Sequence, residues 1–342
     1  MFDGRKDVIL GIMNRKLDEI TCLVSLGITL VMVGHSYPAV SFVNDSAISF
    51  LFKFVYSFHM PLFMFISGLL FIYSTRDIVR FDYITFISKK IKRLLVPYFF
   101  ISSLAFPVKA LFSSQAYRPI ELSFRSYVGT ILFPWSNTII FFWFLPTLFL
   151  IFLIAPFLRD KAICGHKNLH VLLTLVILVL YLAVDEYSIP LMNLSGAMSY
   201  LIFFWLGCLY CLYKGSIESY FEKRLFLFFS IVILIALVSF DAKIGFLSFL
   251  RACVGIAMSI SLSKYLVRRK IRIFSFIDHY SYQIYLLSWF FSTGIRIVFF
   301  QLLGLGLYPT AMLMFVAGLF LPVYLAKFIE KQMPSMKVLI GL

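Results

Sequence analysis

Charged residues are scarce in this chain. Only 14% of its 342 residues are charged, whereas 61% are hydrophobic, and the mean hydropathy is +0.95. A chain of this composition has too little polar material to cover a water-exposed surface, which excludes an ordinary soluble domain. The composition therefore indicates an integral membrane protein with several spans.

Acidic residues are the scarcer sign of charge, with 16 Asp and Glu against 31 Lys and Arg. All of them fall in predicted loops or near the ends of predicted spans, and Asp45 and Asp278 lie closest to the membrane. A proton-coupled carrier usually has a carboxylate at mid-depth in the membrane. This distribution therefore disfavours that class of transporter.

Cysteine is too sparse to define a site. The chain has five cysteines, an odd number, and their spacing matches neither a disulfide framework nor a zinc cluster. Cys208 and Cys211 form a CxxC pair on an apolar segment, where packing is the expected role. The N-terminus lacks a small-residue cleavage site, so we expect no removable signal peptide. We predict one membrane domain over residues 1–342, with no metal and no permanently bound cofactor.

Long apolar runs dominate the rest of the sequence. A membrane-spanning helix needs roughly 20 apolar residues, and continuous runs indicate helices, because barrel strands are short and alternate in polarity. We therefore predict an all-α bundle of about ten spans. The predicted spans are centred on residues 20–42, 48–74, 94–112, 139–158, 168–184, 194–213, 224–240, 245–266, 280–302 and 306–328.

The net charge of +15 mainly reports topology. If both termini are cytoplasmic, 24 of the 31 basic residues fall on cytoplasmic segments, as the positive-inside rule expects. We therefore predict cytoplasmic termini and no nucleic-acid binding. Seven basic residues are exceptions, on outward segments or within spans: Lys53, Lys109, Arg118, Arg125, Lys243, Arg251 and Arg296.

The longest cytoplasmic connection, residues 75–93, has the pattern of a basic amphipathic helix at the membrane surface. Pro97 is expected to open the next span after it. Four basic residues close this connection: Lys89, Lys90, Lys92 and Arg93. They are either a plain positive-inside anchor or a clamp for phosphate groups.

His35 and His59 are the candidates for acid–base chemistry inside the membrane. Each lies 15 residues from the predicted cytoplasmic edge of its span, which is roughly 22 Å at the helical rise of ~1.5 Å per residue. The two imidazoles can therefore meet if the first two spans are antiparallel neighbours. The structural alternative for each histidine is burial with satisfied hydrogen bonds.

Pro61 adds polarity beside His59. A proline has no N–H to donate to the carbonyl of Ser57, and its ring opens that turn of the helix. A freed carbonyl one turn from His59 could then orient the imidazole. Ser67 projects from a similar face of the same predicted helix, which makes it a candidate supporting residue.

Five motifs in register resemble the acyltransferase-3 family of integral membrane acyltransferases. They are VMVGHS, FHMPLFMFISGLLF, SKKIKRLLVPYFF, FFWFLPTLFLIFLIAP and SYQIYLLSWF, and the likeness covers residues 18–330. Members of this family move an acyl group, commonly acetyl from cytoplasmic acyl-CoA, onto sugars such as O-antigen, exopolysaccharide or peptidoglycan. The resemblance implies an O-acetyltransferase of the bacterial inner membrane, with His35 as the catalytic histidine and His59 as its FHMP histidine.

The chain departs from the family pattern at two positions. Many members have an arginine eleven residues before the first histidine, where this chain has Val24. Many also end the YLLH motif with histidine, where this chain has Ser288. No appended hydrolase-like domain is expected, so the membrane part itself should complete the transfer.

The resemblance suggests roles for both reactants. Lys89, Lys90, Lys92 and Arg93 would grip the phosphates of acyl-CoA, and the pantetheine arm would reach toward His35. His35 would either deprotonate a sugar hydroxyl or carry the acyl group transiently. Ser36 or Ser67 as nucleophile is a further alternative, although neither sits in a triad order.

A second group of residues suggests an acceptor site. Lys53, Arg251 and Arg296 lie in the outer halves of spans, where each alone would extend to the headgroups. If they converge, they would form an electropositive vestibule for a pyrophosphate-linked lipid or an acidic sugar. Trp143, Trp289, Tyr282 and Tyr285 could stack on sugar rings, and interfacial anchoring is the alternative role for such aromatic residues.

Two other classes of function compete with the enzyme. A carrier or flippase could move a glycolipid or small solute through the same basic vestibule, and a structural subunit could serve a polysaccharide assembly complex. The histidine pair favours the enzyme. The oligomeric state stays open.

Overall fold

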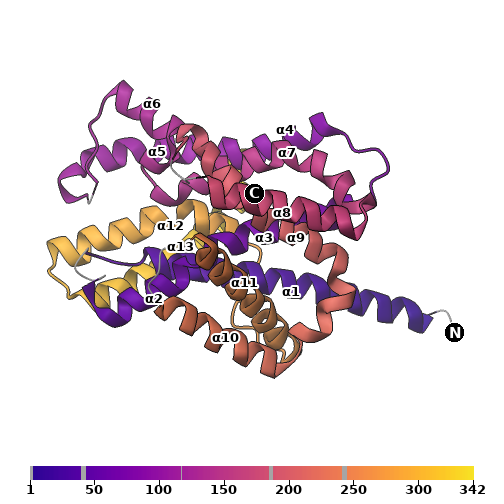
Figure 1. The fold of residues 1–342 in the computed structure, drawn as a ribbon. Helices are drawn as coiled ribbons and strands as arrows, with labels where there is room; N and C mark the ends of the chain where they lie inside the picture. Colours follow the sequence, from indigo (N-terminus) through magenta and orange to yellow (C-terminus); the bar gives the residue numbers. More distant parts are fainter. Residues whose placement is uncertain (1–2, 40–43, 117, 185–187, 241–244) are drawn as a thin grey trace.

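The computed structural model describes residues 3–39, 44–116, 118–184, 188–240 and 245–342, which leaves Lys243 outside the described residues. Every regular element in the described part of the chain is helical, which confirms the all-α prediction. In Figure 1, α10 lies on one side of α1 and α4 and α7 lie on the other. The α-helices are α1 (Asp3–His35), α2 (Ser46–Tyr56), α3 (His59–Thr75), α4 (Tyr83–Lys90), α5 (Val96–Leu111), α6 (Phe124–Leu132), α7 (Phe144–Cys164), α8 (Lys167–Ala183), α9 (Leu194–Phe221), α10 (Arg224–Ser239), α11 (Gly245–Arg268), α12 (Ser281–Ile295) and α13 (Leu307–Gln332).

Eight helical stretches of the described chain are long and apolar enough to cross a membrane. The fifth and seventh predicted spans correspond to α8 and α10, which are apolar but have 17 and 16 residues. That length is close to the lower limit of about 17 residues for a span. The chain is thus a multi-pass membrane protein, whereas the count of ten spans and the cytoplasmic termini stay predictions.

The second predicted span is not one continuous helix. It is divided at Ser57 and Phe58 into α2 and α3, with Phe58 in a non-helical conformation at φ −145° and ψ −14°. Pro61 falls in the first turn of α3, where a missing N–H leaves no intrahelical bond unmade. The opened turn expected at Pro61 is therefore a complete helix break, and His59 is the first residue of the new helix.

The third predicted span is continuous with the amphipathic segment that precedes it. A π-helical turn, Ile91–Leu95, joins α4 to α5 without an intervening loop. Such turns carry one extra residue, and they are frequent at functional sites. A second π-helical segment, Arg296–Leu302, follows α12 directly. Because the helix is continuous through Ile91–Leu95, it is already formed before Pro97. This proline falls in the first turn of α5 and does not open the span, which the sequence had suggested.

Close backbone contact holds α3 against α9 at the centre of the bundle. A Cβ added to Gly68 would collide with the carbonyl of Phe204, and one added to Gly207 would collide with the carbonyl of Phe65. Small residues allow such an approach between helices in a membrane. The glycine pair thereby fixes α3, and with it the histidine at its first residue.

A buried charge cluster joins α1, α9 and α11. Lys264 is 1% exposed, and its Nζ lies 3.0 Å from Glu19 and 2.5 Å from Glu218. Lys214 lies 3.3 Å from the same Glu19 carboxylate and 3.5 Å from Glu218. The sequence placed these carboxylates near span ends but did not reveal that they balance a buried lysine.

Candidate active site

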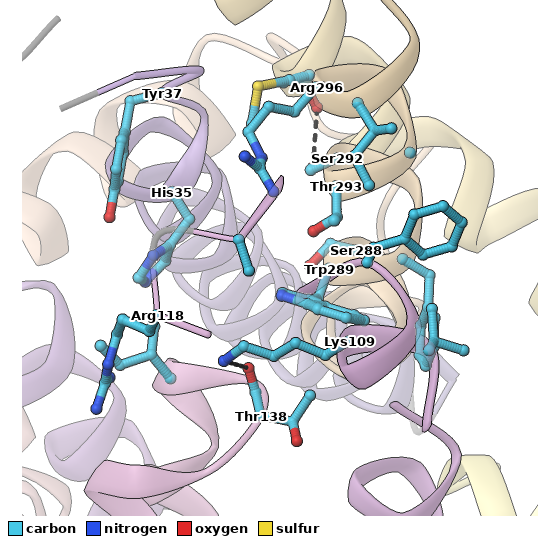
Figure 2. Close-up of a pocket in the computed structure, with 18 of the residues that line it drawn as sticks. His35, Tyr37, Lys109, Arg118, Thr138, Ser288, Trp289, Ser292, Thr293 and Arg296 are labelled. Carbon is cyan, nitrogen blue, oxygen red and sulfur yellow. Dashed lines mark hydrogen bonds between the residues drawn. The ribbon is translucent and has the colours of Figure 1, made fainter. Parts of the chain in front are cut away.

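His35, the last residue of α1, lines a cavity of about 510 Å³, here called the His35 cavity. Its walls come from the ends of α5 and α12, the π-helical segment Arg296–Leu302 and the short helix Ile140–Trp143. Figure 2 shows His35 and Ser288 among the side chains around this cavity. A cavity of this size fits a sugar-sized ligand.

Aromatic rings hold the imidazole of His35. The ring of Phe141 lies 4.7 Å from it, centroid to centroid, and that of Tyr56 lies 6.0 Å away in an edge-on orientation. The hydroxyl of Tyr56 donates a hydrogen bond to the carbonyl of Gly34, at 2.9 Å. Tyr56 therefore ties the end of α2 to the end of α1 beside the histidine.

His59 is buried behind the same tyrosine. Its ring lies 4.9 Å from the ring of Tyr56, again edge-on, so that Tyr56 contacts both imidazoles. Nδ1 of His59 is 2.9 Å from the carbonyl oxygen of Val55. Because a carbonyl only accepts, Nδ1 carries a proton and donates it in this hydrogen bond.

The two histidines thus gather around one residue, as the comparison of their depths predicted. They do not both line one cavity, because His59 is 2% exposed and is absent from the wall of the His35 cavity. The carbonyl that orients His59 belongs to Val55, one turn before it. The sequence predicted the carbonyl of Ser57 as the group that orients His59.

A second cavity, of about 390 Å³, lies on α3 and the π-helical turn Ile91–Leu95, and is here called the Lys90 cavity. Lys90 and Arg93 line it, together with Ser67 and Tyr282. The amine of Lys90 lies 3.8 Å from the centroid of the Phe152 ring, a cation–π contact that holds it in place.

Only half of the predicted phosphate clamp faces the Lys90 cavity. Lys89 and Lys92 are exposed and are not part of the wall. Residues three apart share a helix face, which accounts for Lys90 and Arg93 pointing the same way while their neighbours point elsewhere.

Two aromatic residues separate the two cavities. Phe141 lines the His35 cavity and Tyr285 lines the Lys90 cavity. Their ring centroids are 5.4 Å apart, and the hydroxyl of Tyr285 bonds to the carbonyl of Phe141. We call this pair the aromatic partition.

Comparison with known proteins identifies the family. A family model described as an acyltransferase domain matches residues 18–328. The chain belongs to the acyltransferase-3 family. It is therefore a multi-pass membrane acyltransferase, and both histidines, both cavities and the aromatic partition lie within the matched residues.

One curated relative of this acyltransferase is the nodulation protein NolL of Mesorhizobium japonicum. The two chains are 32% identical over 148 residues, which are 40% of this chain and 37% of NolL. The match therefore spans little more than a third of that relative's length. No solved structure matches the acyltransferase.

The departures from the family pattern lie at the two cavities. Ser288, which replaces the YLLH histidine, is 2% exposed and lines the His35 cavity. Val24, which stands where many members have arginine, lines the Lys90 cavity. Both substitutions therefore change the chemistry of a cavity wall.

The two other serines considered as nucleophiles donate to their own helices. Ser36 Oγ donates to the carbonyl of Met32 at 2.6 Å and is buried, away from the wall of the His35 cavity. Ser67 Oγ donates to the carbonyl of Phe63 at 2.8 Å, and its side chain lines the Lys90 cavity. Neither hydroxyl is hydrogen-bonded to a base within the part of the chain that the structure describes.

The predicted acceptor residues do not converge. Lys53 and Arg251 line a third cavity, of about 410 Å³, whereas Arg296 lines the His35 cavity. Arg251 donates to the carbonyls of Leu237, at 2.9 Å, and Phe240, so it caps the end of α10. Lys53 and Arg251 therefore share one cavity while Arg296 faces another, so the three do not form a single vestibule.

Aromatic residues also divide between packing and cavity walls. Trp143 is 7% exposed and stacks on Trp135 at 4.8 Å, outside the wall of the His35 cavity. Trp289 does line that cavity, and Tyr282 and Tyr285 line the Lys90 cavity. Trp143 therefore packs against other aromatic residues and is not placed to stack on a ligand in the His35 cavity.

Two basic residues in the His35 cavity were missed as site residues. Lys109 and Arg118 both lie in its wall, beside Arg296. The available signal was their membership of the seven basic residues that break the positive-inside pattern. Their place in this cavity was not predictable, because Lys109 lies in the last turn of α5 and Arg118 in the connection after it. Both are far from His35 in the sequence.

Proposed function

We propose that this acyltransferase moves an acetyl group from cytoplasmic acyl-CoA to a hydroxyl of a surface or lipid-linked saccharide, such as O-antigen or exopolysaccharide, in a bacterial inner membrane. The observation that carries the proposal is the pair of cavities on either side of the aromatic partition, one lined by Lys90 and Arg93 and the other by His35. Such an arrangement suits a donor and an acceptor that arrive from opposite sides of a membrane.

The Lys90 cavity is the proposed donor site and would face the cytoplasm. Lys90 and Arg93 supply charged donors for the phosphates of acyl-CoA. The remaining wall is largely aromatic and aliphatic, which suits the pantetheine arm. In this proposal the thioester reaches His35 when Phe141 and Tyr285 move apart. Lys89 and Lys92 would contribute only long-range attraction.

The His35 cavity is the proposed reaction site. A nitrogen of the imidazole takes the proton of the acceptor hydroxyl, the hydroxyl oxygen attacks the thioester carbonyl, and the carbon–sulfur bond breaks to release the thiolate of CoA. In the alternative route, the imidazole attacks the thioester carbonyl and displaces the thiolate of CoA. The acceptor hydroxyl then attacks the acyl-imidazole, loses its proton and releases the imidazole. In both routes His59 is a positioning residue that acts on His35 through Tyr56.

A carrier or flippase is the competing interpretation of the cavities. Purified protein in detergent, incubated with radiolabelled acetyl-CoA, should release free CoA and label an extracted saccharide acceptor. Mass spectrometry of surface glycans from cells with and without the gene should show one acetyl unit gained per modified residue. Movement of a glycolipid without any release of CoA would reject the enzyme proposal.

A further inference from the structure

Three cationic side chains meet in the His35 cavity from separate parts of the chain. Lys109 comes from the last turn of α5, Arg118 from the connection that follows it, and Arg296 from the start of a π-helical segment. Figure 2 shows all three around the cavity together with His35. Arg296 is only 7% exposed, so extension to bulk headgroups does not account for its position.

Neutral groups hold two of these cations in place. The amine of Lys109 donates to the carbonyl of Thr138 at 3.1 Å, and Nη2 of Arg118 donates to the carbonyl of Trp135 at 3.0 Å. A lysine has three N–H donors and an arginine has five. Most of their donors therefore stay available, and the carbonyls leave the positive charges uncancelled.

No carboxylate belongs to the wall of this cavity among the residues that the structure describes. Elsewhere the same protein pairs its buried cations with acids. Lys264 bonds to Glu19 and Glu218, and Arg159 lies 2.7 Å from Asp160. Three basic side chains thus line the His35 cavity without a carboxylate in the described wall, and clustered like charges repel one another unless an anion joins them.

We propose that the acceptor carries an oxyanion, a phosphate or a carboxylate, which Lys109, Arg118 and Arg296 bind while His35 faces the hydroxyl to be acylated. This inference rests on the proposed function and specifies its substrate class. The apolar and aromatic part of the wall, which includes Trp289 and Val298, covers the neutral face of the sugar or lipid. Charge pairing in this partly enclosed cavity fixes the position of the acceptor hydroxyl relative to His35.

The test measures binding to the full-length protein in phosphatidylcholine nanodiscs by isothermal titration calorimetry. The probes are inorganic pyrophosphate, methyl glucuronide and neutral methyl glucoside. We expect at least one anionic probe to bind more than tenfold tighter than the glucoside, with an affinity that falls as salt rises. Preference for pyrophosphate points to a phosphate-linked acceptor, and preference for the glucuronide points to an acidic sugar. Equal binding of all three probes overturns the proposal.

Substitutions then locate the site. The double change Lys109→Gln and Arg118→Gln should weaken anion binding at least tenfold and leave glucoside binding unchanged, whereas Lys109→Arg should keep most of it. Arg125→Gln is the matched control, because this exposed arginine of α6 is not part of the cavity wall. Thermal unfolding of each variant checks the fold. Undiminished anion binding by the folded double variant contradicts the proposal.

The same variants separate this inference from the proposed function. His35→Ala should abolish acetyl transfer and retain anion binding, because the three cations stay in place. If the wild-type protein binds the anion but transfers no acetyl group to any acceptor, the proposed function fails and the oxyanion site stands. If it transfers acetyl equally well to neutral and anionic saccharides, the oxyanion site fails and the proposed function stands.

Discussion

The hydroxyl of Tyr285 donates a hydrogen bond to the main-chain carbonyl of Phe141, at 2.5 Å. This bond holds the aromatic partition closed between the Lys90 and His35 cavities. A closed partition keeps water in one cavity away from a thioester in the other.

Opening the partition should uncouple the reaction. Phe141→Ala removes the ring that separates the cavities, so we expect acetyl-CoA hydrolysis without acceptor to rise several-fold while transfer to the saccharide falls. Release of free thiol in the presence and absence of acceptor measures both rates. Phe157→Ala, at an exposed position of α7 away from both cavity walls, is the control. Unchanged hydrolysis would mean that Phe141 is no barrier.

His35 should be indispensable for transfer. We expect His35→Gln to lower kcat by about 10²–10⁴-fold, the range that a positioned acid–base group contributes. The matched control is His166→Gln, since His166 is exposed at the start of α8 and lies outside both cavity walls. A folded His35→Gln protein with kcat close to wild type would exclude a catalytic role.

The effect on acetyl-CoA binding should depend on which lysine is changed. Lys90→Gln should raise KM for acetyl-CoA with little change in kcat, because the lost contact is to a phosphate that takes no part in bond making. Lys89→Gln removes an equal charge one residue away, outside the cavity, and should have a much smaller effect. Equal effects of the two changes would point to long-range attraction alone, without a specific clamp.

The buried charge cluster should dominate stability at its end of the bundle. Lys264→Met leaves Glu19 and Glu218 with Lys214 alone, and breaking a buried pair in this way costs about 3–5 kcal/mol. We expect a clear fall in the unfolding temperature in detergent and partial recovery when Glu19→Gln is added. The exposed Lys331→Met should have no effect. A double variant less stable than Lys264→Met would contradict this assignment.

The helices follow from the sequence because long apolar runs leave no alternative in lipid, so every predicted span has a helical counterpart. The helical rise likewise predicted that His35 and His59 can approach each other, and both imidazoles contact Tyr56. The direction in which a side chain points was harder to predict than its position along the helix axis. Helix depth depends on residue count, whereas the cavity that a side chain enters depends on helix rotation and on breaks.

Two residues illustrate this limit. Arg296 and Arg251 have similar predicted depths, yet one lines the His35 cavity and the other caps α10. Lys109 and His35 line the same cavity although they lie far apart in the sequence, and such a long-range approach has no local signature. The π-helical turns are similarly invisible, since one extra residue in a helix barely alters an apolar pattern.

The π-helical turn at Ile91–Leu95 lies beside two consecutive lysines, Lys89 and Lys90. Converting such a turn to regular α-helix would rotate α4 by about 100° relative to α5. That rotation would turn Lys90 away from the wall of the Lys90 cavity. The wider turn thus decides which side chain of this basic segment faces the cavity.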